Sequence, residues 1–354
     1  MRVQADEIRR WIRADFDVEL ASMEPVDLGS DTAAMLWRGA ARDGTAYAIK
    51  WTTGGSTAGY AISSHLAGLG IGGIVAPAHT VDGRPWSQRG GRRLVVTPWL
   101  SGDRAVEHRM DQQQWTSYGA LLARIHAAPR PEDPLPAEDY THHEVTSATS
   151  AVDRELRTHR ARDHIVQDLA TQWQAGLGGR IRWLLDCADE LAAQLRAEPP
   201  PQVLCHGDPH LGNVLLVDGR PWLLDWDDAM LAPPERDLVL LKGGMGGYGP
   251  QDPHEQVWFE MGYGSADVDP VVLAYYRCTR AVEDVVYFAQ DILDLDRRPA
   301  ERADLMEIIR GVAGPTGLVR CAVSSLRGLG RRPRALRPMN LFALPGLSRQ
   351  DPDK

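Results

Sequence analysis

The sequence is poor in cysteine and in long apolar runs. Its four cysteines, in a chain of 354 residues, are widely spaced and form no CxxC pair. Neither a zinc site nor a disulfide framework is therefore expected, and this cysteine usage fits a reducing cytosol. No apolar run approaches the roughly 20 residues that cross a bilayer, and the charged N-terminal segment does not resemble a signal peptide. These absences predict a cytoplasmic protein with no membrane partner.

An excess of basic charge is also missing, because the net charge at pH 7 is −9. A nucleic-acid-binding protein needs basic surface to meet phosphate, so we expect no nucleic-acid partner, and the negative balance favours a cationic one. Hydrophobic residues make up 43% of the chain and charged residues 25%, which is ordinary for a globular protein with a sizeable core. The length suggests two domains or one large bilobal unit, as a monomer or a homodimer.

Lysine is scarce as well. Of the 39 basic residues only three are lysines, namely Lys50, Lys242 and Lys354. Since arginine cannot replace a compact point charge, a lysine retained in an apolar segment is informative. Lys50 lies in the apolar run 46–51, which follows the run 34–39 across a loop containing Asp43-Gly44. This pattern predicts a β-hairpin with Lys50 on its second strand.

Short strands dominate the first hundred residues and helices most of the remainder. We therefore predict a strand-rich lobe over residues 1–97, a connecting segment at 98–102, a helical lobe over 103–326 and a poorly ordered basic tail over 327–354. Helices are expected at 57–69, from a capping box at Asp111 and Gln114, over 163–197 with a break at Gly178-Gly179, over 270–293 and over 301–326.

The densest chemical signal is the segment VLCHGDPHLGNVLLVDGRPWLLDWDD, residues 203–228. Two apolar runs in it flank Asp218-Gly219, which predicts a two-residue type I′ turn. Such a turn pairs Val217 with Arg220 and fixes the register of the whole hairpin. His206 and His210 in this segment are expected to form hydrogen bonds rather than to bind zinc.

That register brings Asn213 and Asp225 to the same end of one ladder, within about one residue step. An amide oxygen and a carboxylate are hard ligands that suit Mg²⁺. Asp208 lies five residues before Asn213, in a loop with Gly207 and Pro209. A carboxylate beside a metal that neutralises phosphate charge is what a phosphoryl transferase needs.

The stretch HGDPHLGN followed by LLDWDD resembles the catalytic and metal-binding loops of the aminoglycoside phosphotransferase family. This family is the small-molecule branch of the protein-kinase-like fold. The resemblance implies an α+β bilobal fold, with a small antiparallel-sheet lobe that binds nucleotide and a larger, mainly helical lobe. It further implies that Asp208 is catalytic, that Asn213 and Asp225, with Asp227, bind Mg²⁺, and that ATP is the phosphoryl donor.

The remaining nucleotide contacts follow from the same resemblance. Lys50 resembles the lysine that grips the α- and β-phosphates. The segment DLGSDTA stands where the nucleotide-positioning loop belongs and offers Ser30 and Asp31, although it contains one glycine only. The segment VVTPWLSG resembles the hinge, whose backbone is expected to bind adenine near Thr97 and Trp99.

The sequence departs from the kinase pattern in one respect. The kinase lysine normally pairs with a glutamate on the following helix, but residues 57–69 contain no acidic residue. His65 stands near the expected position. Three alternatives remain open: Lys50 is oriented differently, His65 substitutes for the glutamate, or a carboxylate comes from elsewhere.

The substrate is expected to be a small cation that carries a hydroxyl group. Residues 227–249 look most like the branch of the family that acts on spectinomycin, with a role in resistance or self-protection. Carboxylates should then line the acceptor site, and the candidates are Asp228, Glu235, Glu283 and Asp284. The neighbouring Arg236 and Asp237 are expected to form a buried ion pair. Alternatives are a kinase of choline, homoserine or a sugar, and a nucleotide-binding pseudoenzyme.

Overall fold

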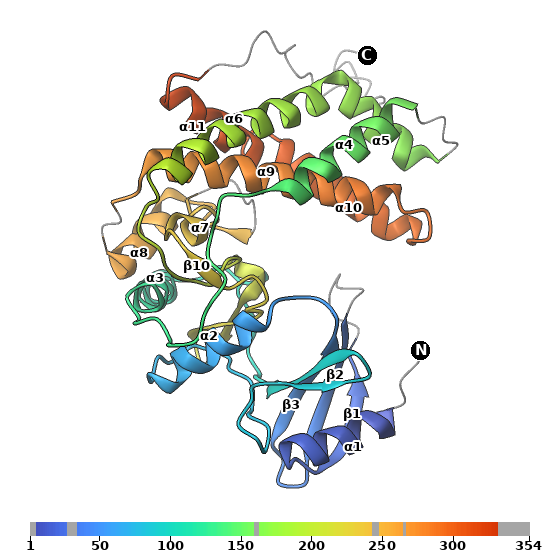
Figure 1. The fold of residues 1–354 in the computed structure, drawn as a ribbon, viewed down its shortest axis with the longest axis vertical. Helices are drawn as coiled ribbons and strands as arrows, with labels where there is room; N and C mark the ends of the chain where they lie inside the picture. The colour runs from blue at the N-terminus through green and yellow to red at the C-terminus, as the bar shows by residue number, and fades with distance from the viewer. Residues whose placement is uncertain (1–4, 27–33, 159–162, 243–247, 265–266, 332–354) are drawn as a thin grey trace, which may run out of the picture. The chain divides into compact units, whose positions relative to one another are not determined.

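A computed structural model of the chain describes residues 5–26, 34–158, 163–242, 248–264 and 267–331 (Figure 1). Contacts divide it into two compact units. The first lies within Met1–Asp139, Pro199–Lys242 and Gly247–Val268, and the second includes Tyr140–Glu198 and the chain from Asp269 onward. The lobes expected at 1–97 and 103–326 follow a different division and stay a prediction. Most of the expected tail, from residue 332, lies outside the described residues.

An antiparallel sheet forms the N-terminal part of the first unit, with the strand order β1-β2-β3-β5-β4 (Figure 1). The strands are β1 (Leu20–Pro25), β2 (Ala34–Ala41), β3 (Ala46–Thr52), β4 (Ser87–Arg89) and β5 (Arg92–Pro98). The predicted hairpin is confirmed, because β2 pairs with β3 and Lys50 faces Leu36. The apolar pair Ile74-Val75, in contrast, contributes only an isolated bridge, between Ile74 and Leu223.

Helix α1 (Ala5–Phe16) was not expected from a strand-rich beginning. Its buried residues Ile8, Ile12 and Phe16 recur every fourth position and form one apolar face. They join Trp37 and Ile49 of the sheet in one core cluster. Helix formation here depends on that packing.

Helix α2 (Thr57–Gly68) follows β3 and agrees with the predicted range 57–69 to within one residue. Ser56 caps its N-terminus, and the Ser56 hydroxyl accepts a hydrogen bond from the Ala58 N–H. Gly59 in its first turn lies against the segment that carries the predicted metal ligands. A Cβ atom at Gly59 would stand 1.8 Å from the Trp226 carbonyl oxygen.

The rest of the first unit surrounds the segment 203–228. Its strands are β6 (Asp103–Arg104), β7 (Val203–Cys205), β8 (Val214–Val217), β9 (Arg220–Leu223) and β10 (Met230–Ala232), paired as β6-β8-β9 and β10-β7. Its helices are α3 (Gln112–His126), α7 (Glu235–Leu238) and α8 (Pro253–Tyr263). The predicted capping box of Asp111 and Gln114 is confirmed at the start of α3.

Helices build the second unit around α9 (Pro270–Leu293), whose bounds agree with the prediction (Figure 1). Helix α9 contacts α4 (His143–Thr158), α5 (His164–Gln172), α6 (Gly178–Ala197), α10 (Pro299–Ala313) and α11 (Leu318–Gly328). Two expectations were wrong. The break in 163–197 lies at Gly176, where φ is 141° within the π-helical turn Trp173–Leu177, and not at Gly178-Gly179. Residues 301–326 form two helices instead of one.

A search of the described residues for a helix both long and apolar enough to cross a bilayer found none.

Candidate active site

The hairpin β8–β9 has the predicted register. Asp218 and Gly219 have φ values of 49° and 74°, and a type I′ turn requires positive φ at both central positions. Val217 faces Arg220, and Val214 faces Leu223. The Leu224 N–H donates to the Asn213 carbonyl at 2.9 Å, which extends the ladder by one step. Asn213 and Asp225 therefore lie at the same end of the hairpin.

Asp208 and Asn213 are in direct contact. The Asn213 amide nitrogen Nδ2 donates to the Asp208 carbonyl at 2.9 Å and lies 3.5 Å from the carboxylate oxygen Oδ2. Because the amide nitrogen is used in this way, Oδ1 is the Asn213 atom that remains to bind a cation. That amide oxygen and the Asp225 carboxylate form a donor set whose chemistry fits Mg²⁺.

His206 connects the Asp208 loop to the hairpin. Its Nε2–H donates to the Leu224 carbonyl at 2.8 Å, and its Nδ1 accepts from the Asp208 N–H at 3.3 Å. The ring also packs against Trp226, with 4.6 Å between centroids. His206 thus acts through hydrogen bonds, as expected. His210 does the same, because its Nδ1 accepts from the Gly212 N–H at 2.9 Å.

Asp237 anchors the same loop by hydrogen bonds, a role that the sequence did not reveal. Its buried carboxylate accepts hydrogen bonds from the His206 N–H at 2.9 Å, the Gly207 N–H at 2.7 Å and the His126 Nε2 at 3.0 Å. Burial acts to raise the pKa of Asp237, but the hydrogen bond and charge of His126 hold it below its ordinary value. The expected ion pair with Arg236 is wrong, because Arg236 pairs with Glu138 at 3.3 Å.

The ligand atoms of His126, Cys205 and Asp237 lie within 4.8 Å of one another. A metal would need the Cys205 thiolate. Burial raises the pKa of the Cys205 thiol well above its ordinary value, and its Sγ donates to the Ala232 carbonyl. In this structure the group is a hydrogen-bonded core cluster, because His126 and two backbone N–H groups already contact the Asp237 oxygens.

Lys50 reaches the predicted metal ligands from β3. Its Nζ lies 2.6 Å from Asp227 Oδ2 and 3.7 Å from Asp225 Oδ1. Burial acts to lower the pKa of Lys50, but the charges of Asp225 and Asp227 outweigh it and raise the pKa. His65 is directed elsewhere, since its Nε2 contacts the Pro129 carbonyl at 2.8 Å. Of the three alternatives, the structure favours a carboxylate from outside the helix.

Of the other residues predicted to contact the nucleotide, the structure describes two and not the other two. Ser30 and Asp31 lie outside the described residues. Thr97 pairs with Ala48 near the end of β5. The Trp99 N–H donates to the Ala46 carbonyl at 2.9 Å, so this donor is already used within the fold.

The four candidate acceptor carboxylates fall in different units. Asp228 is exposed in the first unit, whereas Glu235, at the start of α7, is only 4% exposed there. Glu283 and Asp284 lie on α9 of the second unit. Asp284 pairs with Arg280 at 2.9 Å. Of the two candidates in the first unit, Asp228 is therefore the one with an exposed carboxylate.

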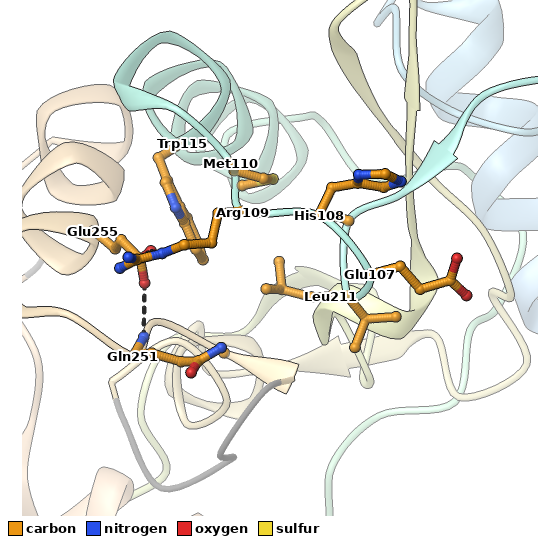
Figure 2. A pocket seen from close by; sticks show the side chains of 11 residues that line it. Glu107, His108, Arg109, Met110, Trp115, Leu211, Gln251 and Glu255 are labelled. Carbon is orange, nitrogen blue, oxygen red and sulfur yellow. Dashed lines mark hydrogen bonds and ion pairs between the residues drawn. The ribbon is translucent and has the colours of Figure 1, made fainter.

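A pocket of about 230 Å³ lies beside the Asp208 loop within the first unit (Figure 2). Leu211 of that loop, Met110 and Trp115 supply apolar walls. Its buried Glu255 accepts from the Gln251 N–H at 2.8 Å, the dashed line in Figure 2, and also pairs with Arg109. The pocket contains none of the residues predicted for nucleotide, metal or acceptor.

Comparison with known proteins decides the family. Residues 48–275, which include every part of this site from Lys50 to Asp237, match the model of the phosphotransferase enzyme family. The chain belongs to this family. It is therefore a phosphotransferase with an alcohol group as acceptor, and the predicted kinase-like α+β fold is confirmed.

Individual relatives agree with this assignment. A crystal structure of spectinomycin phosphotransferase APH(9)-Ia, in complex with ADP and spectinomycin, is 25% identical, with a TM-score of 0.79 over 92% of this chain and 99% of that one. Protein StrN of Streptomyces griseus is 30% identical over 238 residues, which are 64% of this chain and 71% of StrN. An amicoumacin kinase, 16% identical, shares the fold over 90% of this chain and 97% of its own, with a TM-score of 0.58.

Proposed function

We propose that this phosphotransferase transfers the γ-phosphoryl group of ATP to a hydroxyl of an aminocyclitol or aminoglycoside antibiotic similar to spectinomycin, as a resistance or self-protection enzyme. One observation carries the proposal: a rigid hairpin brings Asn213 and Asp225 to one end, and Asn213 there contacts Asp208. The similarity to a phosphotransferase crystallised with ADP and spectinomycin supports the choice of nucleotide and acceptor class.

Asp208 orients the acceptor hydroxyl and accepts its proton. Three contacts prepare it for this role. His206 fixes its backbone N–H, Asn213 approaches its carboxylate, and the His210 Nε2 lies 3.4 Å from Oδ2. The loop thus presents the carboxylate in a defined position before a substrate arrives, which reduces the entropic cost of reaching the transition state.

Asn213 Oδ1 and the Asp225 carboxylate would hold magnesium. When bound, the ion neutralises charge on the phosphates during transfer. Lys50 supplies a further positive charge to the α- and β-phosphates from β3. Asp227 was grouped with the metal ligands on the basis of the sequence, but its carboxylate is engaged by Lys50.

Adenine binding is assigned to the backbone near Thr97 and Trp99, at the end of β5. Contacts from Ser30 and Asp31 to phosphate stay a prediction. On the acceptor side, the exposed Asp228 is the strongest candidate to meet a cationic amine. The contributions of Glu235, Glu283 and Asp284 stay predictions as well.

An ATP-consumption assay over an acceptor panel of spectinomycin, aminoglycosides, choline, homoserine and sugars tests the proposal. We expect turnover with an aminocyclitol or aminoglycoside. Asp208→Asn should lower kcat by about 10²–10⁴-fold, because general-base catalysis contributes that much. Asp218→Asn is the matched control, because it makes the same change at the turn of the hairpin that follows the Asp208 loop and should retain activity.

Other outcomes identify the alternatives. Turnover of choline, homoserine or a sugar alone would replace the antibiotic with a metabolite. Nucleotide binding without turnover on the whole panel would favour a pseudoenzyme. Full activity of Asp208→Asn would contradict the proposed catalytic residue, whichever acceptor is used.

A further inference from the structure

The helix that follows the phosphate-gripping lysine has no acidic side chain to offer. Residues 57–68 of α2 read TAGYAISSHLAG. Its His65 is bound to the Pro129 carbonyl. Any charge that holds the Lys50 ammonium must therefore come from another part of the first unit.

Two aspartates meet Lys50, and they are not equivalent. Asp227 Oδ2 lies at hydrogen-bond distance, 2.6 Å, and the two side chains are only 24% and 20% exposed. Asp225 Oδ1 lies farther away, at 3.7 Å, on a side chain that is 54% exposed. A charge-assisted hydrogen bond that is shielded from water is much stronger than a solvated contact. Asp227 is therefore the principal partner of Lys50.

The loop before α2 fixes Asp227 in this place. The Ser56 N–H donates to the Asp227 carbonyl at 3.2 Å. Gly55 lies so close that a Cβ atom there would be 2.4 Å from the Asp227 carboxyl carbon. Arg93 in turn holds the loop by donating to the carbonyls of Gly54 and Gly55. The segment that leads into α2 thus helps to position Lys50 indirectly, because it packs against Asp227. In the kinase pattern the helix helps directly, through the charge of its glutamate.

We propose that Asp227 is the positioning residue for Lys50 and does not serve as a magnesium ligand. The inference rests on the proposed function, because it assigns a task within the same site. Asp227 takes over the task that a glutamate of the following helix has in the kinase pattern. Asn213 and Asp225 are then the protein ligands of the ion.

A double-mutant cycle tests the dependence of Asp227 on Lys50. We expect Asp227→Asn to lower kcat/KM for ATP by about 10–100-fold, as for a lost hydrogen bond to a charged group. In a Lys50→Met background, Asp227→Asn should lower kcat/KM for ATP by less than about threefold. If Asp227 acts only through Lys50, its substitution has no further effect once Lys50 is absent. The Mg²⁺ concentration for half-maximal rate should stay unchanged in Asp227→Asn and rise at least about tenfold in Asp225→Asn.

A second measurement needs neither nucleotide, metal nor acceptor. The chain has only three lysines, so acylation of Lys50 by an amine-directed reagent can be followed by peptide mass spectrometry. Asp227→Asn should accelerate the acylation of Lys50 severalfold. Lys242, which pairs with Glu260 at 2.6 Å in the same unit, is the internal standard, and Asp218→Asn should change neither rate.

The proposal is overturned if Asp227→Asn lowers kcat/KM for ATP equally in the Lys50→Met background. It is also overturned if the Mg²⁺ concentration for half-maximal rate rises in Asp227→Asn as it does in Asp225→Asn. An unchanged acylation rate of Lys50 in Asp227→Asn would also refute it. Failure of the proposed function looks different, because activity would then survive Asp208→Asn or be absent from the wild type, while the acylation result would still test the ion pair.

Discussion

Four aspartates of the first unit show how differently one residue type can be used. Asp208 contacts an amide and an imidazole, and Asp225 is exposed on a left-handed backbone with a φ of 56°. Asp227 pairs with Lys50, whereas Asp237 is buried beneath three donors. Their surroundings, and not their identity, therefore distinguish their roles.

Asp237→Asn should destabilise the protein by about 3 kcal/mol at pH 7, because it breaks a buried pair and leaves a backbone donor unsatisfied. The pKa of Asp237 is lowered in the folded state. Its contribution to stability is therefore complete above its unfolded pKa of about 3.9 and is lost as the pH falls through the lower, folded value. Urea unfolding between pH 7 and pH 2.5 should show the difference from wild type shrinking below pH 4.

A difference that stayed constant down to pH 2.5 would mean that the charge of Asp237 does not stabilise the Asp208 loop. Asp218→Asn again serves as the control, since it changes an aspartate at an exposed turn. It should leave the free energy of unfolding within about 0.5 kcal/mol of wild type at every pH.

The sequence predicted the relative placement of those candidate site residues that depends on local geometry. Asn213 and Asp225 follow from a two-residue turn, and Asp208 lies five residues before Asn213. The partner of Lys50 could not be derived in this way, because Asp227 is 177 residues away. Their contact depends on how the loop before α2 packs. The role of Asp237 could not be predicted for the same reason, because the donors that it binds, the N–H groups of His206 and Gly207, are about 30 residues away in the sequence.

At the scale of elements, α2 packs closely against the Asp225–Asp227 segment at Gly59. Gly59→Ala adds a Cβ atom 1.8 Å from the Trp226 carbonyl oxygen. The resulting clash should outweigh the better helix propensity of alanine, which is worth about 1 kcal/mol. Gly59→Ala should therefore lower the Tm, as measured by calorimetry, and raise KM for ATP.

Gly68→Ala is the matched control, because it makes the same substitution in the same helix at a position where a Cβ atom meets nothing within 4 Å. It should leave the Tm unchanged or raise it. If Gly59→Ala raised the Tm as well, the packing of α2 on the hairpin would not constrain the site.

The bounds of a helix could be predicted where a single sequence pattern, such as a continuous apolar face, determines them. Helix α9 has a continuous apolar face and was predicted to the residue. The break at Gly176 was misplaced by two positions, because three neighbouring glycines compete for it and only Gly176 takes a positive φ. Helices α10 and α11 were merged because an apolar spacing runs through both, although Gly314 and Gly317 separate them. Helix α1 was missed because its apolar face needs the sheet to cover it.

At the scale of the whole molecule, the residues predicted to bind nucleotide and metal belong to one compact unit, while the candidate acceptor carboxylates belong to two. The residues matched by the family model, 48–275, contain Lys50 and the predicted metal ligands but not Ser30 and Asp31. The acceptor group cannot be ranked from the sequence, since acidic residues on a helix are as often solvated as bound.

ADP should stabilise the protein in a magnesium-dependent manner. At 100 times its Kd a ligand adds about 2.7 kcal/mol to the free energy of unfolding. Thermal unfolding with ADP should therefore show a rise in Tm that is larger with Mg²⁺ than with EDTA. In Asp225→Asn the magnesium-dependent part should disappear and the remainder should persist. An equal rise under both conditions in the wild type would contradict the metal assignment.

The pairing of Lys50 with Asp227 has a consequence for control of activity. In protein kinases the helix that carries the glutamate can be repositioned, and the ion pair with the lysine then breaks. Here the counter-ion belongs to the stretch next to Asp225 and is anchored to the chain by Ser56. If α2 moved outward, the negative charge beside Lys50 would stay with the segment that carries Asp225, and the ion pair would be disturbed only through the contacts of Gly55 and Ser56 with Asp227.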